Sequence, residues 1–285
     1  MEPDPKGMND YPHSAQAGTG SLPTDLNVPS FHNTGDVVGA VFQLYRDNFL
    51  SLLKIVVVLA VPLIVAQHIF LKLSRVPLAE VTIYVSAIVG ESLMSGALIY
   101  AVVTFLRTGA FPTLADSYTW GRKRWGRVLF CSFLYMLVVV AGCMALIVPG
   151  IIFSLMFALV VPVAVLEDKP ASDSFSRSRD LTRNYRLQIF LTYFVFSLLI
   201  FVISLVTNAG FGGEPEDEIS LPFALVQGLI TQLLESSSTV LTLFIYLGIL
   251  RDTSQLSTQF PNAPPPPPPG DDPARASQVE TGREF

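Results

Sequence analysis

Six apolar stretches alternate with polar segments along the chain, and this pattern sets the first expectation about its structure. A helix that crosses a hydrocarbon core of about 30 Å needs roughly 20 consecutive apolar residues. Five stretches reach that length, and the shorter fourth follows the third after only Pro149 and Gly150. The pattern predicts six transmembrane helices, over residues 49–71, 81–106, 128–148, 151–166, 187–206 and 223–250.

The dipeptide Pro149-Gly150 is interpreted as a tight turn between the third and fourth helices. Proline removes a backbone donor, and glycine relaxes the constraints on the backbone. The alternative is one long kinked helix over 128–166. At about 1.5 Å per residue such a helix would span nearly 60 Å, roughly twice the hydrocarbon core, so the hairpin is preferred.

Basic residues gather in two of the connecting segments. Residues 107–127 and 167–186 are rich in Lys and Arg, whereas the Pro149 turn and residues 208–221 contain neither. Cytoplasmic loops carry an excess of Lys and Arg. We therefore expect both basic segments and both termini in the cytoplasm, with the acidic cluster at 214–218 outside.

A stretch with a helical apolar period precedes each predicted hairpin, at about 37–45, 114–125 and 175–185. Basic amphipathic helices with aromatic residues lie in the headgroup plane and are attracted to anionic lipid. The fold expected is an all-α integral membrane domain of three hairpins, each preceded by a cytoplasmic amphipathic helix. The alternative, that any short basic loop shows this pattern, stays open. The expected headgroup contacts are Arg122, Lys123, Arg124, Arg127, Arg177, Arg179, Arg183 and Arg186.

The two ends of the chain differ from the apolar domain at 34–252. Residues 1–33 and 253–285 mix Pro, Gly, Ser and Asp without periodicity, which predicts disordered cytoplasmic tails. The run Pro264–Pro269 predicts a stiff polyproline helix of roughly 19 Å. We interpret it as a spacer, and the alternative is a docking site for a protein partner.

Three motifs carry a resemblance to a known family. They are VPGIIF at 148–153, VPVAVLE at 161–167, and DSFSRSRDLTR at 173–183. Together they resemble the membrane domain that precedes the catalytic barrel in some bacterial glycerophosphoryl diester phosphodiesterases. The resemblance covers about residues 34–252, although Gly248 stands where that family often has an acidic residue. It implies six helices with both ends inside, in a bacterial plasma membrane.

The resemblance does not extend to the enzyme. A barrel of βα units needs about 250 residues, far more than the two tails supply. The chain also lacks a Gly-x-Ser-x-Gly elbow, a His-Glu-x-x-His helix and a phosphate loop ending in Gly-Lys-Ser/Thr. We therefore expect no catalytic residues, no metal and no cofactor.

Composition narrows the class of protein further. Apolar residues make up 51% of the chain and charged residues only 14%. An ordinary soluble domain has about 25% charged residues, so this composition excludes a typical soluble enzyme. The net charge of −5 argues against a nucleic-acid partner.

Two acidic residues fall deep inside predicted spans. Glu91 and Glu235 lie roughly 15–18 Å from the outer ends of the second and sixth helices. An isolated charge at that depth costs about 2.5–3.5 kcal/mol, so we expect each carboxyl either to be protonated or to line water. Ser95 shares a helical face with Glu91, and Thr231 and Ser238 share one with Glu235.

These five residues form a candidate intramembrane polar site, which would exchange protons or bind a cation. The alternative is that neutral carboxyls and hydroxyls merely hold the helices together. The favoured function is a non-enzymatic scaffold or lipid-interacting module at the inner leaflet. The rival is a transporter or channel for a small solute or ion that uses the two carboxylates.

Overall fold

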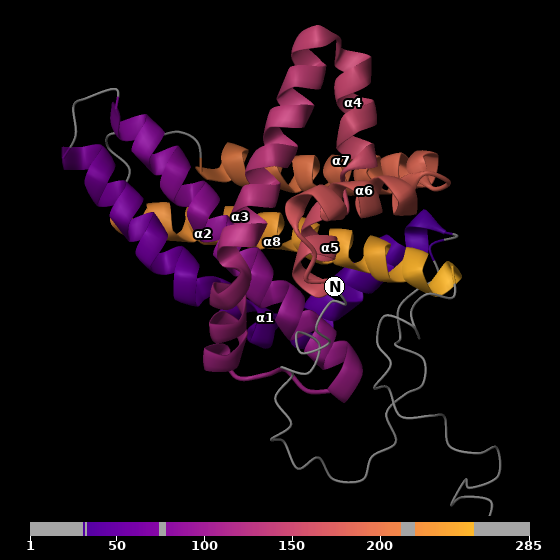
Figure 1. Ribbon diagram of the computed structural model, residues 1–285. Helices are drawn as coiled ribbons and strands as arrows, with labels where there is room; N and C mark the ends of the chain where they lie inside the picture. The colour runs from indigo at the N-terminus through magenta and orange to yellow at the C-terminus, as the bar shows by residue number, and fades with distance from the viewer. Residues whose placement is uncertain (1–30, 32, 74–77, 212–219, 254–285) are drawn as a thin grey trace, which may run out of the picture.

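The protein is built from α-helices. The computed structural model describes residues 31, 33–73, 78–211 and 220–253, and this part contains no strand. The prediction of an all-α fold is therefore confirmed. The helices are α1 (Thr34–Leu73), α2 (Leu78–Thr108), α3 (Leu114–Ala145), α4 (Ile147–Met156), α5 (Val160–Leu166), α6 (Ala171–Thr182), α7 (Arg186–Phe211) and α8 (Leu221–Asp252) (Figure 1).

Six segments of this helical chain are long and apolar enough to cross a membrane. They are Thr34–Phe70, Ile88–Thr108, Leu114–Ala145, Ile147–Leu166, Arg186–Thr207 and Leu221–Asp252. Their order along the chain matches that of the six predicted spans. The chain is thus a multi-pass membrane protein, as its hydropathy pattern predicts.

The predicted surface helices differ in how they join their spans. In α1 the join is marked by Asn48, whose backbone departs from helical geometry (φ −128°, ψ 26°). In α3 there is no join, because the helix runs without interruption from its cap at Thr113, whose hydroxyl accepts the Asp116 N–H at 3.2 Å. The third stretch gives a separate helix, α6, which ends at Thr182 before α7 begins at Arg186.

The turn between the third and fourth spans lies earlier than predicted. Helix α3 ends at Ala145, and Leu146 alone is extended (φ −167°, ψ 147°) before α4 begins. Placing the turn at Pro149-Gly150 was therefore wrong, because both residues lie in the first turn of α4. Proline is tolerated there, since the first N–H groups of a helix have no intrahelical acceptor. Gly150 serves close packing, because a Cβ at this position would lie 2.2 Å from Cys143 Sγ.

The fourth span is broken, which the predicted continuous helix over 151–166 does not anticipate. Helix α4 ends at Met156 and α5 begins at Val160. The Met156 carbonyl accepts hydrogen bonds from the hydroxyls of Ser178 and Thr182, both at 3.1 Å, and Ser178 Oγ accepts the Leu159 N–H at 3.2 Å. Backbone groups freed by a break inside a packed domain need such partners. Hydroxyls of α6 therefore make the break possible.

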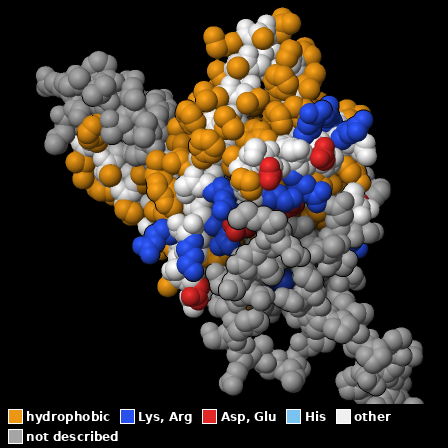
Figure 2. All heavy atoms as spheres, viewed as in Figure 1, with side chains coloured by type: hydrophobic (Ala, Val, Ile, Leu, Met, Phe, Trp, Pro, Cys, Tyr) orange, Lys and Arg blue, Asp and Glu red, His pale blue; other side chains and the backbone are white. Residues whose placement is uncertain are grey.

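The most extensive contact between two described helices is that of α2 with α3. A Cβ at Gly121 would lie 2.9 Å from the Ala97 backbone nitrogen, and one at Gly96 would lie 3.4 Å from Gly121 Cα. In Figure 1 the α3–α4 hairpin projects beyond the other helices, and Figure 2 shows that apolar side chains cover it. An apolar surface of this extent is what a hydrocarbon environment requires.

The chain enters and leaves the helical domain at the same end. Phe31 is fully buried, and its N–H donates to Asp252 Oδ2 at 3.0 Å. Packing therefore extends to Phe31, beyond the predicted domain boundary at residue 34. Apart from Phe31, Asn33 and Thr253, the predicted tails lie outside the described residues, as do the polyproline run and the acidic cluster at 214–218.

Candidate functional site

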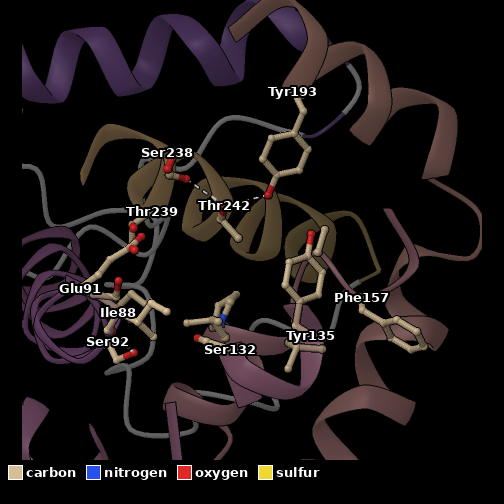
Figure 3. Close-up of a pocket in the computed structure, with 16 residues that line it drawn as sticks. Ile88, Glu91, Ser92, Ser132, Tyr135, Phe157, Tyr193, Ser238, Thr239 and Thr242 are labelled. Atoms are coloured by element: carbon tan, nitrogen blue, oxygen red, sulfur yellow. Dashed lines mark hydrogen bonds between the residues drawn. The ribbon is translucent and has the colours of Figure 1, made fainter. Parts of the chain in front are cut away.

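A polar cavity of about 320 Å³ lies among the membrane helices. It is bounded by α2, α3, α7 and α8 together with the break between α4 and α5. Its lining residues are Ile88, Glu91, Ser92, Ser95, Ile99, Ser132, Tyr135, Phe157, Ala158, Val160, Val161, Pro162, Tyr193, Ser238, Thr239 and Thr242 (Figure 3).

One side of the cavity combines a carboxyl with hydroxyls from α2 and α8. Three of these hydroxyls donate to carbonyls of their own helix: Ser92 to Ile88 at 2.8 Å, Ser238 to Glu235 at 2.7 Å, and Thr242 to Ser238 at 2.8 Å. Such bonds to the preceding turn are the usual way for Ser and Thr to satisfy their donors within a helix. Each oxygen keeps acceptor capacity, so this side of the cavity is rich in acceptors.

Two tyrosines stand on the other side of the cavity. Tyr193 of α7 shares a 2.7 Å hydrogen bond with the Thr242 hydroxyl, and Tyr135 of α3 donates a long, 3.5 Å bond to the Ser154 carbonyl. Figure 3 shows both phenol groups directed into the same region, with Glu91 and Ser92 across from them. The sequence did not identify these two tyrosines, or Ser132, as residues of a site. The sequence feature that could have identified them is a tyrosine or serine in the middle of an otherwise apolar span.

The five residues of the predicted intramembrane site divide into two groups. Glu91, Ser95 and Ser238 line the cavity. Glu235 does not line it but is close enough to Glu91 for the two carboxyls to interact electrostatically. Thr231 is exposed on α8 and donates to the Gln227 carbonyl at 3.1 Å, away from the cavity lining. Among the described residues, neither glutamate has an ion-pair partner.

The break in the fourth span faces this cavity. Phe157 and Ala158, which follow the last turn of α4, belong to its lining, as do Val160, Val161 and Pro162 of α5. The carbonyl end of a helix carries partial negative charge. At the Met156 carbonyl this end is already capped by the hydroxyls of Ser178 and Thr182, and the start of α5 lies beside it in the lining.

A second polar region lies at the basic end of the domain. Arg122 and Lys123 of α3 are exposed, as are Arg179 of α6 and Arg183 just after it. None of these four has a carboxylate partner in the described part of the chain. We call them the basic surface. Figure 2 shows Lys and Arg side chains in a band beneath the projecting hairpin, with acidic side chains among them.

Three other arginines predicted to contact headgroups are engaged within the protein. Asp168 pairs with Arg127 and lies 3.4 Å from Arg124 Nε, without hydrogen-bond geometry to the latter. Glu167, whose side chain is only 2% exposed, contacts Arg177 at 3.2 Å and Lys169 at 2.7 Å. These ion pairs join the two basic segments of the sequence into one structure. The eighth predicted contact, Arg186, is partly buried, and its Nε has no hydrogen-bond partner among the residues that the structure describes.

Comparison with known proteins adds a family model but no function. The model, described as a domain of unknown function (DUF7847), matches residues 122–253. This range runs from the basic surface through the end of α8, and it excludes α1 and α2, and with them Glu91. No curated protein and no solved structure gave a significant match.

Proposed function

We propose that the chain is a non-enzymatic membrane module that binds anionic lipid headgroups at the inner leaflet of a bacterial plasma membrane. The observation that carries this proposal is the basic surface, in which four exposed cations have no carboxylate partner within the described part of the chain. Each Lys or Arg near an anionic membrane surface contributes about 1 kcal/mol. If the basic surface also holds a partner protein at the membrane, the chain acts as a scaffold.

The proposed orientation places the basic end and both termini in the cytoplasm. Asp168 brings the two basic segments together, and the Gln188 amide donates to the Phe31 carbonyl close to the start of α7. The domain's first and last described residues therefore lie beside the basic segments, where the excess of Lys and Arg favours the cytoplasmic side.

The arrangement in three hairpins belongs to the same proposal. We assign the hairpins to α1–α2, α3–α4/α5 and α7–α8, with α6 lying along the inner leaflet. Four side chains of α6 are buried, namely Ser174, Ser178, Leu181 and Thr182, whereas Arg179 and Asp180 are exposed. This division into a buried and an exposed face supports the proposal that α6 packs on the helix bundle and presents its charged side chains to lipid headgroups. The resemblance to the phosphodiesterase membrane domain supports the same arrangement.

Native mass spectrometry of the full chain tests the lipid proposal. The purified protein is titrated with phosphatidylglycerol, and the bound fraction is compared with that of the double variants R122Q/K123Q and R179Q/R183Q. We expect each pair to weaken binding about tenfold or more. The matched control is Arg46→Gln, an exposed arginine of α1 that pairs with Asp47 at 3.0 Å. Equal affinity in all variants would contradict the proposal.

A second candidate function is the binding and transport of a small solute or ion through the cavity. It is favoured by one specific observation, the broken helix beside Glu91, because discontinuous helices mark the binding sites of many transporters. Liposomes containing the protein and a trapped pH-sensitive dye test this candidate under imposed gradients of Na⁺, K⁺ or methylammonium. Flux that exceeds empty liposomes and disappears in Glu91→Gln would support transport, whereas equal flux with and without the protein would contradict it.

A further inference from the structure

The polar cavity adjoins a second, more apolar one, and the two share a wall. The second cavity is also about 320 Å³ and lies between α4 and α7. Tyr135, Ala158 and Tyr193 belong to the lining of both. The remaining residues of the second cavity are Ile151, Ser154, Leu155, Phe190, Phe194 and Ser197.

The second cavity opens toward the apolar surface of the domain. Ile151, Phe190 and Phe194 from its lining are among the exposed apolar side chains, and the ring centroids of Phe190 and Phe194 lie 5.9 Å apart. Side chains of this kind at membrane depth face acyl chains. An apolar chain lying between α4 and α7 would thus end at the two tyrosines, with the polar cavity directly behind them.

The chemistry of the polar cavity calls for a ligand that donates hydrogen bonds and carries positive charge. Glu91 is the one carboxyl in its lining, and Glu235 lies near enough to interact with it electrostatically. The hydroxyls of Ser92, Ser238 and Thr242 already donate to backbone carbonyls, so they offer acceptors.

A tightly held divalent metal ion does not fit this description. In the described part of the chain, no three His, Cys, Asp or Glu side chains gather as a cluster that could hold one. A bare ion would also leave most of a 320 Å³ cavity to water. An ammonium group on a carbon chain supplies the charge, three donors and the bulk.

We propose that the polar cavity binds the ammonium group of an amphipathic amine, whose apolar chain lies in the neighbouring cavity between α4 and α7. Glu91 accepts from the ammonium, with Ser238 and Thr239 as further acceptors beside it. Tyr135 and Tyr193 flank the passage between head and chain. The same ammonium chemistry occurs in a phospholipid headgroup, phosphatidylethanolamine, and in a free long-chain amine. The inference rests on the cavity of the second candidate function but requires only binding, not transport.

Binding is measured by native mass spectrometry of the full chain with three probes that have chains of equal length. The probes are phosphatidylethanolamine, phosphatidylglycerol and an alkylammonium without phosphate. We expect Glu91→Gln to weaken the binding of at least one ammonium probe about tenfold or more, because a charge-assisted hydrogen bond is lost. The matched control is Asp180→Asn, which changes an exposed carboxyl of α6 outside both cavity linings and should weaken binding by less than threefold.

The three probes together show whether the ammonium ligand is a lipid headgroup or a free amine. They also test this inference separately from the proposal that the basic surface binds anionic lipid. Binding of phosphatidylethanolamine that depends on Glu91 assigns the site to a lipid headgroup, and Glu91-dependent binding of the alkylammonium alone assigns it to a free amine. Phosphatidylglycerol binding should depend on the basic surface and not on Glu91. Ammonium probes that bind equally to wild type and Glu91→Gln would overturn the inference. Thermal unfolding of each variant in detergent shows that loss of binding is not loss of fold.

Discussion

The hydroxyl of Tyr246 donates a 3.0 Å hydrogen bond to the carboxylate of Glu167. This bond connects α8, where Tyr246 is fully buried, to the residue that ends α5. Glu167 also contacts Arg177 of α6 and Lys169. One buried carboxylate thus links the bundle to the helix that carries part of the basic surface. It explains how α6, a helix with few apolar side chains, is held in place.

Removing this link should destabilise the protein. We expect Glu167→Gln and Tyr246→Phe each to lower the free energy of unfolding by about 1–3 kcal/mol, since both lose a charge-assisted hydrogen bond. Because the two residues share that bond, the double variant should lose less than the sum of the single losses, by at least about 0.5 kcal/mol. Unfolding in mixed micelles measures all three values. Strict additivity would show that the bond contributes nothing.

The crossing of α2 and α3 depends on the absence of a side chain at Gly121. We expect Gly121→Ala to lower the unfolding temperature, at a cost of about 1–3 kcal/mol, because its Cβ would meet the backbone of Ala97 at 2.9 Å. Gly126 lies on the same helix, and a Cβ there would meet nothing within 4 Å. Gly126→Ala should therefore be neutral or stabilising by up to about 1 kcal/mol. A reversed order of the two unfolding temperatures would refute this packing.

The break in the fourth span depends on Ser178. In Ser178→Ala, the Leu159 N–H loses its acceptor and the Met156 carbonyl loses one of its two donors. We expect a loss of about 1–3 kcal/mol, together with faster hydrogen exchange of the Leu159 amide. Ser172→Ala, on the exposed side of the same helix, is the control. Unchanged exchange at Leu159 in Ser178→Ala would mean that the hydroxyl does not stabilise the break.

Hydropathy alone was enough to predict the spans, because a hydrocarbon core imposes length and composition on each helix separately. It could not place the turn at Leu146 or the break after Met156. The turn depends on Gly142 and Gly150 packing against each other, and the break depends on hydroxyls of α6, which is a later segment of the chain. Contacts between distant segments leave no local periodicity.

The candidate site was predictable in part for the same reason. Glu91, Ser95 and Ser238 were found because a carboxyl or hydroxyl stripe inside an apolar span is a local signal. Tyr135 and Tyr193 complete the cavity from two other helices, and only the fold shows that they meet there. The basic surface could not be identified without the fold either. Asp168 and Glu167 form ion pairs with some of the arginines, and the sequence does not distinguish these from the exposed ones.

The central claim is that a water-accessible polar cavity lies inside the membrane domain, and cysteine labelling tests it most directly. In a background with Cys131 and Cys143 replaced by alanine, Ser238→Cys is compared with Ser236→Cys, using a small cationic thiosulfonate on membrane vesicles of both orientations. Ser238 lines the cavity, whereas Ser236 is fully buried two residues away on the same helix and bonded to Tyr45 at 2.8 Å. We predict rapid labelling of Ser238→Cys and none of Ser236→Cys. If neither cysteine reacts in either orientation while Arg122→Cys does, the cavity is dry, and the account of a ligand site is contradicted.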